Sequence, residues 1–185
     1  MPNLYIIAGC NGAGKTTASY TILPEILHCR EFVNADSIAA GLSPFNAESV
    51  ALEAGRIMLH RINQLMEEKA DFAFETTLST RSYASLVKKA QEIGYQVTLL
   101  FFWLNSPELA IERVAKRVSH GGHNIPVNII ERRYCRGLHN LMKMYIGICN
   151  NWLIVSNMDA DPDIIAEGGS GIDTVIKIPI FGRSY

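Results

Sequence analysis

The sequence lacks an excess of charge of either sign. It has 17 basic and 18 acidic residues, so the formal net charge of the 185-residue chain is -1 at pH 7. Proteins that bind nucleic acid through a broad surface are strongly basic, and we therefore expect no nucleic-acid partner beyond what a small local basic groove could hold. Hydrophobic residues make up 48% of the chain, which favours one folded domain over disorder.

Cysteine is scarce, and its spacing excludes a zinc site. The four cysteines are Cys10, Cys29, Cys135 and Cys149, and no two of them form a CxxC pair. The first residues, MPNLYII, contain no basic segment of the kind that opens a secretory signal. We therefore expect reduced thiols and a cytoplasmic location.

Long hydrophobic runs are also missing. The longest strongly apolar run covers residues 97–104, far short of the roughly 20 residues that a membrane-spanning helix needs. The sequence therefore predicts no membrane partner.

Apolar stretches instead alternate with amphipathic ones along the whole chain. We expect strands at residues 4–8, 31–34, 71–76, 97–104 and 151–157, helices at 15–27, 47–69, 81–93, 106–118 and 126–148, and a hairpin around 168–171. Strands that alternate with helices indicate a mostly parallel sheet with helices on both faces. The predicted fold is a single three-layer α/β domain over residues 1–185, with a C-terminal β-hairpin.

One short segment has very few side chains. Residues 8–17 read AGCNGAGKTT, follow the first strand and match the pattern GxxxxGK[ST] of the P-loop. Glycines let backbone N–H groups turn toward phosphate oxygens, and the next helix adds its positive end. A chance glycine turn is the alternative, but strand, loop and helix come in the required order.

This loop predicts ATP and Mg²⁺ as cofactors. Lys15 would bind the β- and γ-phosphates, and the Thr16 hydroxyl would bind Mg²⁺. The predicted nucleotide-binding residues of the loop are Gly9, Cys10, Asn11, Gly12, Ala13, Gly14, Lys15, Thr16 and Thr17.

Motifs of two large P-loop classes are absent. The chain has no NKxD motif for guanine, and it has neither an LSGGQ signature nor an hhhhD strand of ABC transporter ATPases. Polar residues at strand ends instead suggest a site for a phosphate acceptor.

Asp36 follows one of these strands, where it could take a proton from an acceptor hydroxyl. Its alternative role is to cap a short helix, and both roles can hold. Glu75, with Thr76 and Thr77, ends another strand and could bind substrate hydroxyls or the water shell of Mg²⁺; the alternative is an ion pair. Arg81 would meet an anionic substrate group or remain a solvated charge.

Two arginine-bearing helices flank a glycine-rich break, HGGHNIP, and suggest a lid over residues 106–136. Closure would bring guanidinium groups to the transferred phosphoryl group, where negative charge needs stabilising. The candidates are Arg117, Arg132 and Arg133, and an ordinary solvated helix face is the alternative. His123 would contact the lid or the substrate, or be a plain loop residue.

These motifs together resemble the zeta-toxin family. The segments are AGCNGAGKTT, FVNADSIAAGLSP, FAFETTLSTRSY, RVAKRVSHGGHNIPVNIIERRY and IIAEGGSG, and they look most like the compact bacterial branch labelled predicted ABC-type ATPases. They follow the family's order along nearly the whole chain. The chain is shorter than the well-known toxins, its GGHNIP lid differs from theirs, and the region after Glu75 shows no clear UDP-sugar pocket.

The resemblance implies a kinase that phosphorylates a hydroxyl of UDP-N-acetylglucosamine or a related nucleotide sugar. It implies Asp36 as the general base, Glu75 beside the acceptor, and Arg117 with one of Arg132 and Arg133 as lid arginines. It places Asn157 near adenine and implies an antitoxin partner that blocks the ATP site. Two alternatives stay open, namely an ATPase without a small-molecule acceptor and a nucleotide-binding module that acts through a protein partner.

Overall fold

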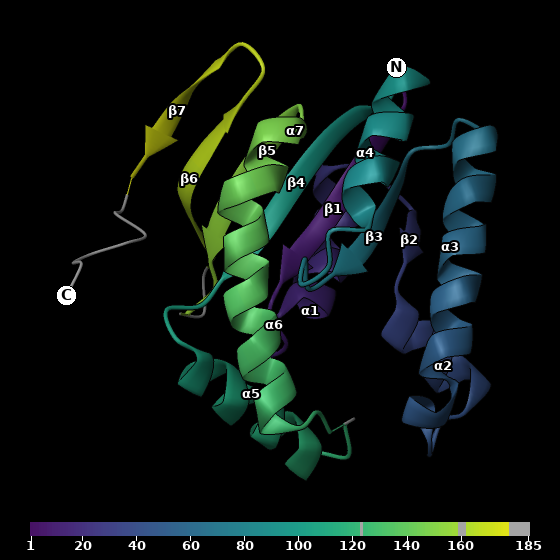
Figure 1. Ribbon diagram of the computed structural model, residues 1–185, viewed down its shortest axis with the longest axis vertical. Helices are drawn as coiled ribbons and strands as arrows, with labels where there is room; N and C mark the ends of the chain where they lie inside the picture. The colour runs from purple at the N-terminus through teal and green to yellow at the C-terminus, as the bar shows by residue number, and fades with distance from the viewer. Residues whose placement is uncertain (123, 159–161, 178–185) are drawn as a thin grey trace.

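The structure is a computed structural model that describes residues 1–122, 124–158 and 162–177. A single sheet of seven strands runs through these residues in the order β2-β3-β1-β4-β5-β6-β7 (Figure 1). The strands are β1 (Asn3–Gly9), β2 (Glu31–Val33), β3 (Phe72–Thr76), β4 (Gln96–Trp103), β5 (Asn151–Ser156), β6 (Asp163–Gly169) and β7 (Ile172–Ile176).

The first five strands are parallel, and the last two are antiparallel. β6 pairs with β5 and then with β7, which confirms the C-terminal hairpin expected around residues 168–171. β1 lies between β3 and β4, so the chain leaves β1 toward one side of the sheet and later returns to the other. Such a switch point is where open α/β sheets bind ligands, beyond the carboxyl ends of the strands.

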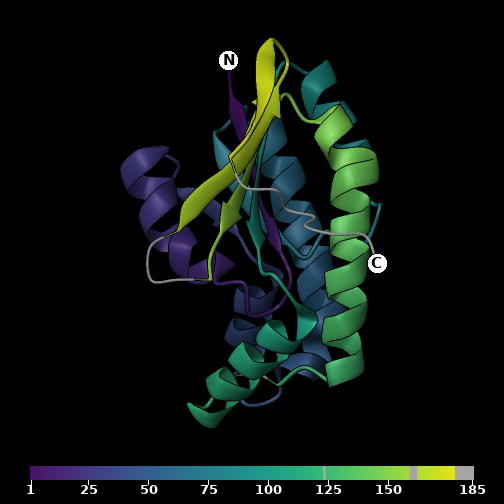
Figure 2. The same ribbon diagram turned by 90° about the vertical axis from the view of Figure 1, so that its left-hand side faces the viewer.

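Helices cover both faces of the sheet, as the alternating sequence predicts. They are α1 (Lys15–Thr21), η1 (Ile22–Ile26), α2 (Ala35–Leu42), η2 (Ala47–Val50), α3 (Ala51–Glu67), α4 (Tyr83–Glu92), α5 (Pro107–Ser119), α6 (Val127–Asn140), η3 (Leu141–Tyr145) and α7 (Ile146–Ile148). Figure 2 views the sheet along its edge, with α1 on one side and α6 on the other. No helix of the described ranges combines the length and the apolar character that crossing a membrane requires.

Two of the predicted helices contain π-helical turns. The helix expected at 15–27 is α-helical only to Thr21 and continues as η1, which holds Pro24. Proline has no N–H to donate within a helix, and a wider turn accommodates it. The helix expected at 126–148 is interrupted in the same way by η3 after Asn140.

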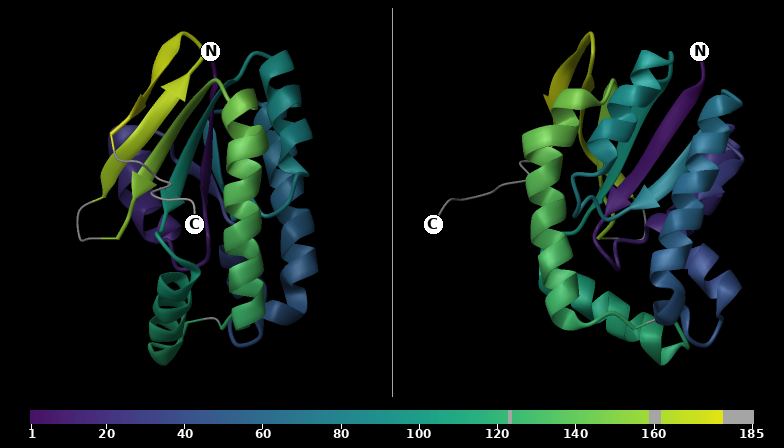
Figure 3. Two further views of the ribbon diagram at one scale, coloured as in Figure 1. Left: turned by 60° about the vertical axis from the view of Figure 1, so that its left-hand side comes forward. Right: turned by 45° about the vertical axis from the view of Figure 1, so that its right-hand side comes forward.

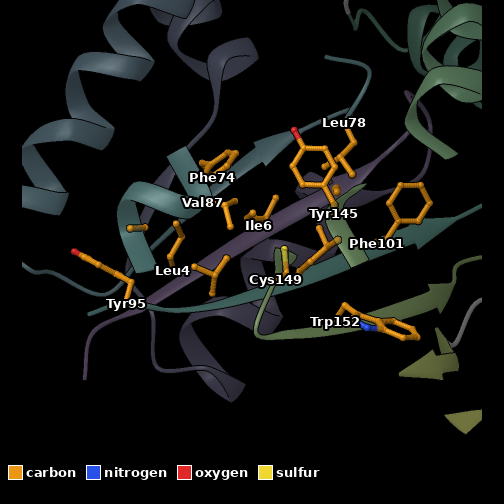
Figure 4. Packing of buried hydrophobic residues seen from close by; sticks show 14 of the residues in the cluster. Leu4, Ile6, Phe74, Leu78, Val87, Tyr95, Phe101, Tyr145, Cys149 and Trp152 are labelled. Atoms are coloured by element: carbon orange, nitrogen blue, oxygen red, sulfur yellow. The ribbon is translucent and has the colours of Figure 1, made fainter. Parts of the chain in front are cut away.

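The buried side chains form two clusters, one on each face of the sheet. β1 contributes Leu4, Ile6 and Ala8 to the larger cluster and Ile7 to the smaller, because successive side chains of a strand point to opposite faces. Figure 4 shows the larger cluster, where Phe74 packs among residues of β1, α4 and η3. The sheet therefore fixes β1, β3 and β4 rigidly at its centre.

Two helical pairs extend past the carboxyl ends of the parallel strands. In the views of Figure 3, α2 and α3 lie on one side of these ends, and α5 and α6 lie on the other. The loop between β1 and α1 lies between the two pairs, and the functional site is built there.

Two phenylalanines offer a matched test of this core. Phe74 is fully buried, whereas Phe45 is fully exposed between α2 and η2. We expect Phe74→Ala to lower the free energy of unfolding by about 3–5 kcal/mol, since it removes buried apolar area and leaves a cavity. Phe45→Ala should change it by less than about 0.5 kcal/mol. Urea unfolding followed by circular dichroism measures both, and equal losses would contradict the assignment of the core.

Candidate active site

From the end of β1 to the start of α1, the backbone has three glycines with positive φ angles, a conformation that strongly favours glycine. Gly12 and Gly14 have φ angles of 81° and 80°, and Gly9 has 144°. A methyl group at Gly9 would overlap the carbonyl oxygen of Phe102, and one at Gly12 would lie 2.8 Å from the carbonyl oxygen of Ala110. The glycines are therefore needed both for the turn and for the close packing of the loop against β4 and α5.

Lys15 starts α1 and lies almost wholly buried at the floor of this loop. Its Nζ donates to the carbonyl oxygen of Cys10 at 2.9 Å and lies 3.6 Å from Glu75 Oε1. A buried ammonium group needs such partners to offset its lost hydration. The lysine is thus held within reach of a phosphate group bound by the loop.

Glu75 makes polar contacts with three residues, Lys15 and Thr16 of α1 and Asn34 after β2. β1 and β3 are paired so that Glu75 stands opposite Ile7, which brings its carboxylate to the start of α1. Its Oε2 accepts from Thr16 Oγ1 at 2.7 Å and from Asn34 Nδ2 at 2.9 Å. The ion pair with Lys15, which was the alternative reading of Glu75, is also present.

The donor set fits Mg²⁺. Thr16 and Glu75 offer a hydroxyl and a carboxylate, which are the hard oxygen ligands that this ion prefers. In the described part of the chain, no group of three or more His, Cys, Asp or Glu side chains could hold a metal. A P-loop needs no such group, because nucleotide phosphates and water complete the coordination shell.

Capping of α2, one of the two roles considered for Asp36, is performed by Asn34 instead. Asn34 caps α2, since its Oδ1 accepts from the backbone N–H groups of Asp36 and Ser37 at 2.8 and 3.3 Å. Asp36 lies in the first turn of the helix, and its side chain lines the central cavity. The Asp36 carboxylate is thus not used in capping and faces the site.

Arg133 extends from α6 to the P-loop. Its Nη1 donates to Asn11 Oδ1 at 3.1 Å. Burial lowers the pKa of the Arg133 guanidinium, and the nearby Asp36 carboxylate opposes that shift. A half-buried cation is therefore placed between the acidic side of the site and the phosphate loop.

A cavity of about 240 Å³ joins these groups. It lies between the P-loop, the start of α2, the end of β3 and α6. Its lining residues are Asn11, Lys15, Asn34, Ala35, Asp36, Met58, Glu75, Thr76, Thr77, Ser79, Thr80, Tyr83 and Arg133.

Seven of the residues predicted for the site line this cavity, namely Asn11, Lys15, Asp36, Glu75, Thr76, Thr77 and Arg133. Arg81 and Arg132 are exposed and do not line it. Arg117 lies near the end of α5 and is not among the lining residues either. His123 lies outside the described residues.

Six lining residues are not predicted by the sequence analysis. Two of them, Asn34 and Ala35, are next to Asp36, and the other four are Met58, Ser79, Thr80 and Tyr83. Met58 belongs to the apolar stripe of a helix, and Ser79, Thr80 and Tyr83 follow β3 without any catalytic spacing. They reach the cavity only because the tertiary structure places α3 and the loop after β3 beside the carboxyl ends of the strands.

Asn157, at the end of β5, contacts the P-loop itself. Its Nδ2 donates to the carbonyl oxygen of Ala13 at 2.7 Å and lies where a methyl group at Gly14 would stand. Arg113 of α5 donates to the carbonyl oxygens of Asn157 and Met158 at 2.7 and 2.9 Å. The end of β5 is thus fastened between the phosphate loop and α5.

Comparison with known sequences gives one family. A family model described as Zeta toxin matches residues 1–151, a range that includes every residue of the cavity. An uncharacterized protein of Haemophilus influenzae is 30% identical over 126 residues, which are 68% of this chain and 88% of that protein.

Comparison with solved structures gives the same fold at low identity. The structure of AvrRxo1-ORF1:-ORF2 with ATP has a TM-score of 0.74 at 18% identity, covering 96% of this chain and 61% of that chain. The PezAT chromosomal toxin-antitoxin system of Streptococcus pneumoniae gives 0.67 at 18% identity, covering 90% of this chain and 72% of that chain. Solved kinases also share the fold, so the architecture is that of P-loop kinases.

The alkylation rates of two cysteines, Cys10 in the P-loop and Cys135 on α6, test how closely the P-loop is packed. Burial raises the pKa of the Cys10 thiol, although Lys15 opposes the shift, whereas Cys135 is exposed on α6. A raised pKa leaves less reactive thiolate near neutral pH. We expect iodoacetamide at pH 8 to alkylate Cys135 at least about tenfold faster than Cys10.

Peptide mass spectrometry after timed alkylation measures both rates, and equal reactivity in urea is the control. Native alkylation of Cys10 as fast as that of Cys135 would show an activated thiol in the loop.

Proposed function

The chain belongs to the zeta toxin family, and we propose that it is an ATP- and Mg²⁺-dependent phosphotransferase that acts on a hydroxyl group of a small acceptor. The observation that carries this proposal is the shared cavity, in which Lys15 stands at the phosphate loop and Asp36 faces it from α2. A phosphate site and a carboxylate base on one cavity are what transfer to a hydroxyl requires.

The leading acceptor is UDP-N-acetylglucosamine or a related nucleotide sugar. The family resemblance supports it, and so does a wall with the hydroxyl groups of Thr76, Thr77, Ser79 and Thr80 and the ring of Tyr83. A volume of about 240 Å³ is below the roughly 300 Å³ of the smallest pockets for drug-sized ligands. The cavity therefore suits the reacting sugar end, while the nucleotide part would extend outside.

Each residue has a defined part in the proposed reaction. ATP is the donor of the phosphoryl group, and a bound Mg²⁺ ion would supply positive charge to the phosphate oxygens. The P-loop N–H groups and Lys15 hold the β- and γ-phosphates, while Thr16 and Glu75 would bind the ion directly or through water. Asp36 takes the proton as the acceptor oxygen bonds to the γ-phosphorus, the bond to the β-phosphate oxygen breaks, and ADP leaves.

Arg133 is proposed to stabilise the charge on the transferred phosphoryl group. Its guanidinium already lies against Asn11 of the P-loop, at 3.1 Å. Residues 106–136 would act as the lid, with Arg117 and His123 brought toward the site on closure, and Asn157 would lie near adenine. These assignments rest on the family resemblance together with the position of α5 and α6 beside the P-loop.

An antitoxin is the proposed protein partner. The solved PezAT structure is a toxin-antitoxin system of the same fold, and a protein that covered the P-loop would exclude ATP. The cytoplasmic location stays a prediction.

The proposed base gives the first test. We expect Asp36→Asn to lower kcat by about 10²–10⁴-fold, since it removes the proton acceptor, while ATP affinity changes by less than about twofold. The assay is ³¹P NMR with Mg-ATP, with and without UDP-N-acetylglucosamine. Asp173→Asn, an exposed change on β7, is the matched control and should behave as wild type.

Three results separate the candidate functions. A new sugar-phosphate signal that needs Asp36 supports the kinase. ADP that forms equally without the sugar and in Asp36→Asn indicates an ATPase without an acceptor. Tight ATP binding with no turnover for any acceptor tested indicates a nucleotide-binding module.

The adjacent arginines of α6 give a second test. Arg133→Ala should lower kcat by about 10²–10³-fold, because it removes a cation from the developing charge. Arg132→Ala should change kcat by less than about threefold, since that side chain is exposed and outside the cavity. Steady-state ADP formation with saturating acceptor measures both, and equal losses would mean that the lid rearranges before transfer.

A further inference from the structure

The segment of residues 76–80, four of which line the cavity, contains one residue with an unfavourable backbone conformation. Leu78 has a φ angle of 56° although it is not glycine, and its side chain is completely buried. Non-glycine residues in this conformation are strained and persist only where surrounding contacts hold them. Thr77, Ser79 and Thr80 of the same segment line the cavity, so the contacts that hold Leu78 also determine the position of this wall.

One local hydrogen bond contributes, from the Leu78 N–H to Thr76 Oγ1 at 3.1 Å. Further contacts come from α6 and η3, far away in the sequence. Asn140 Nδ2 donates to the carbonyl oxygen of Leu78 at 2.8 Å, in a buried hydrogen bond. The Tyr145 hydroxyl donates to the carbonyl oxygen of Thr80 at 3.1 Å. Leu78 and Tyr145 also belong to the same buried cluster (Figure 4).

Gly137 lets the helix come close enough for these bonds. A methyl group there would lie 2.7 Å from the carbonyl oxygen of Thr77. Glycine inside a helix is unfavourable compared with alanine, so its position in the middle of α6 has a packing reason. α6 and η3 therefore contact the backbone of the loop at three residues, Thr77, Leu78 and Thr80.

The π-helical turn η3 allows Tyr145 to make the last of these contacts, the hydrogen bond to Thr80. Tyr145 is five residues after Asn140, and in a regular α-helix it would lie about 140° around the axis. A π-helical turn joins residues five apart, and Ile146 N–H donates to Leu141 in this way. Asn140 and Tyr145 can thus face the same loop.

We propose that Asn140 is the positioning residue of the acceptor site: with Gly137 and Tyr145 it holds residues 77–80 so that Thr77, Ser79 and Thr80 face the cavity. Asn140 is not among the cavity-lining residues and acts only through the loop. The inference rests on the proposed function. α6 would then carry both Arg133, which contacts the P-loop, and Asn140, which supports the acceptor wall.

The test compares three variants of α6 in the full chain. Asn140→Leu keeps the size of the side chain and removes the donor. Gly137→Ala favours the helix but pushes against Thr77, so it separates loop displacement from loss of folding. His139→Ala is the control, because His139 is exposed on the same helix.

Two readouts are expected to move. Hydrogen–deuterium exchange of the amides of residues 76–80 should speed up by about tenfold or more in Asn140→Leu and Gly137→Ala. The KM for UDP-N-acetylglucosamine should rise by about tenfold while kcat falls less, and binding of a fluorescent ATP analogue should change by less than about twofold. His139→Ala should match wild type in all three measurements.

Wild-type exchange in both variants would overturn the proposal. So would a loss of ATP affinity equal to the rise in acceptor KM, which would show a general structural role. If wild-type protein transfers no phosphate to the sugar, the proposed function fails, and the exchange rates still decide whether Asn140 holds the loop.

Discussion

The arrangement of the site depends on the contacts of the Glu75 carboxylate. Glu75 lies at the end of β3, and its partners come from the start of α1 and from the residue after β2, through Thr16, Lys15 and Asn34. The carboxyl ends of three neighbouring strands, β1, β2 and β3, are thus tied together at one nearly buried charge. Removing any partner would leave part of that charge uncompensated, and buried charges tolerate this poorly.

The sheet makes this contact available. Parallel pairing of β1 with β3 sets Glu75 opposite Ile7, and the loop that follows β1 then turns back over the strand ends. The turn is tight because Gly9, Gly12 and Gly14 adopt positive φ angles. In the proposed enzyme, phosphate binding and metal binding would therefore depend on neighbouring residues, with Lys15 at the phosphates and Thr16 at the ion.

The opposite wall of the cavity depends on helices instead of strands. α2 brings Asp36, α3 brings Met58, and α6 brings Arg133 to a space that the P-loop leaves open. The loop after β3 depends on α6 for part of its support, because Asn140 of α6 donates to the carbonyl oxygen of the strained residue Leu78. In the proposed enzyme, both the phosphate side and the acceptor side depend on contacts between residues far apart in the sequence, but only the phosphate side also has a local sequence pattern.

The sequence by itself determined the α/β fold, the phosphate loop and the residues at the carboxyl ends of the strands. These features depend on local patterns: hydrophobic periodicity over a few residues, and a glycine spacing next to a lysine and a threonine. Asp36 and Glu75 could be found for the same reason, because each directly follows an apolar stretch. The capping role of Asn34 was not found, since Asn34 and Asp36 are equally good caps on sequence grounds.

Only the tertiary structure decided which arginine of the pair reaches the P-loop, and which residues complete the acceptor wall. Arg132 and Arg133 are adjacent and chemically identical, and the rotation of α6 on the sheet places one at Asn11 and the other at the surface. Met58 and Asn140 are ordinary helix residues in sequence, yet one lines the cavity and the other holds its loop. Contacts across tens of residues depend on how helices pack on the sheet, and no local pattern of residues encodes that packing.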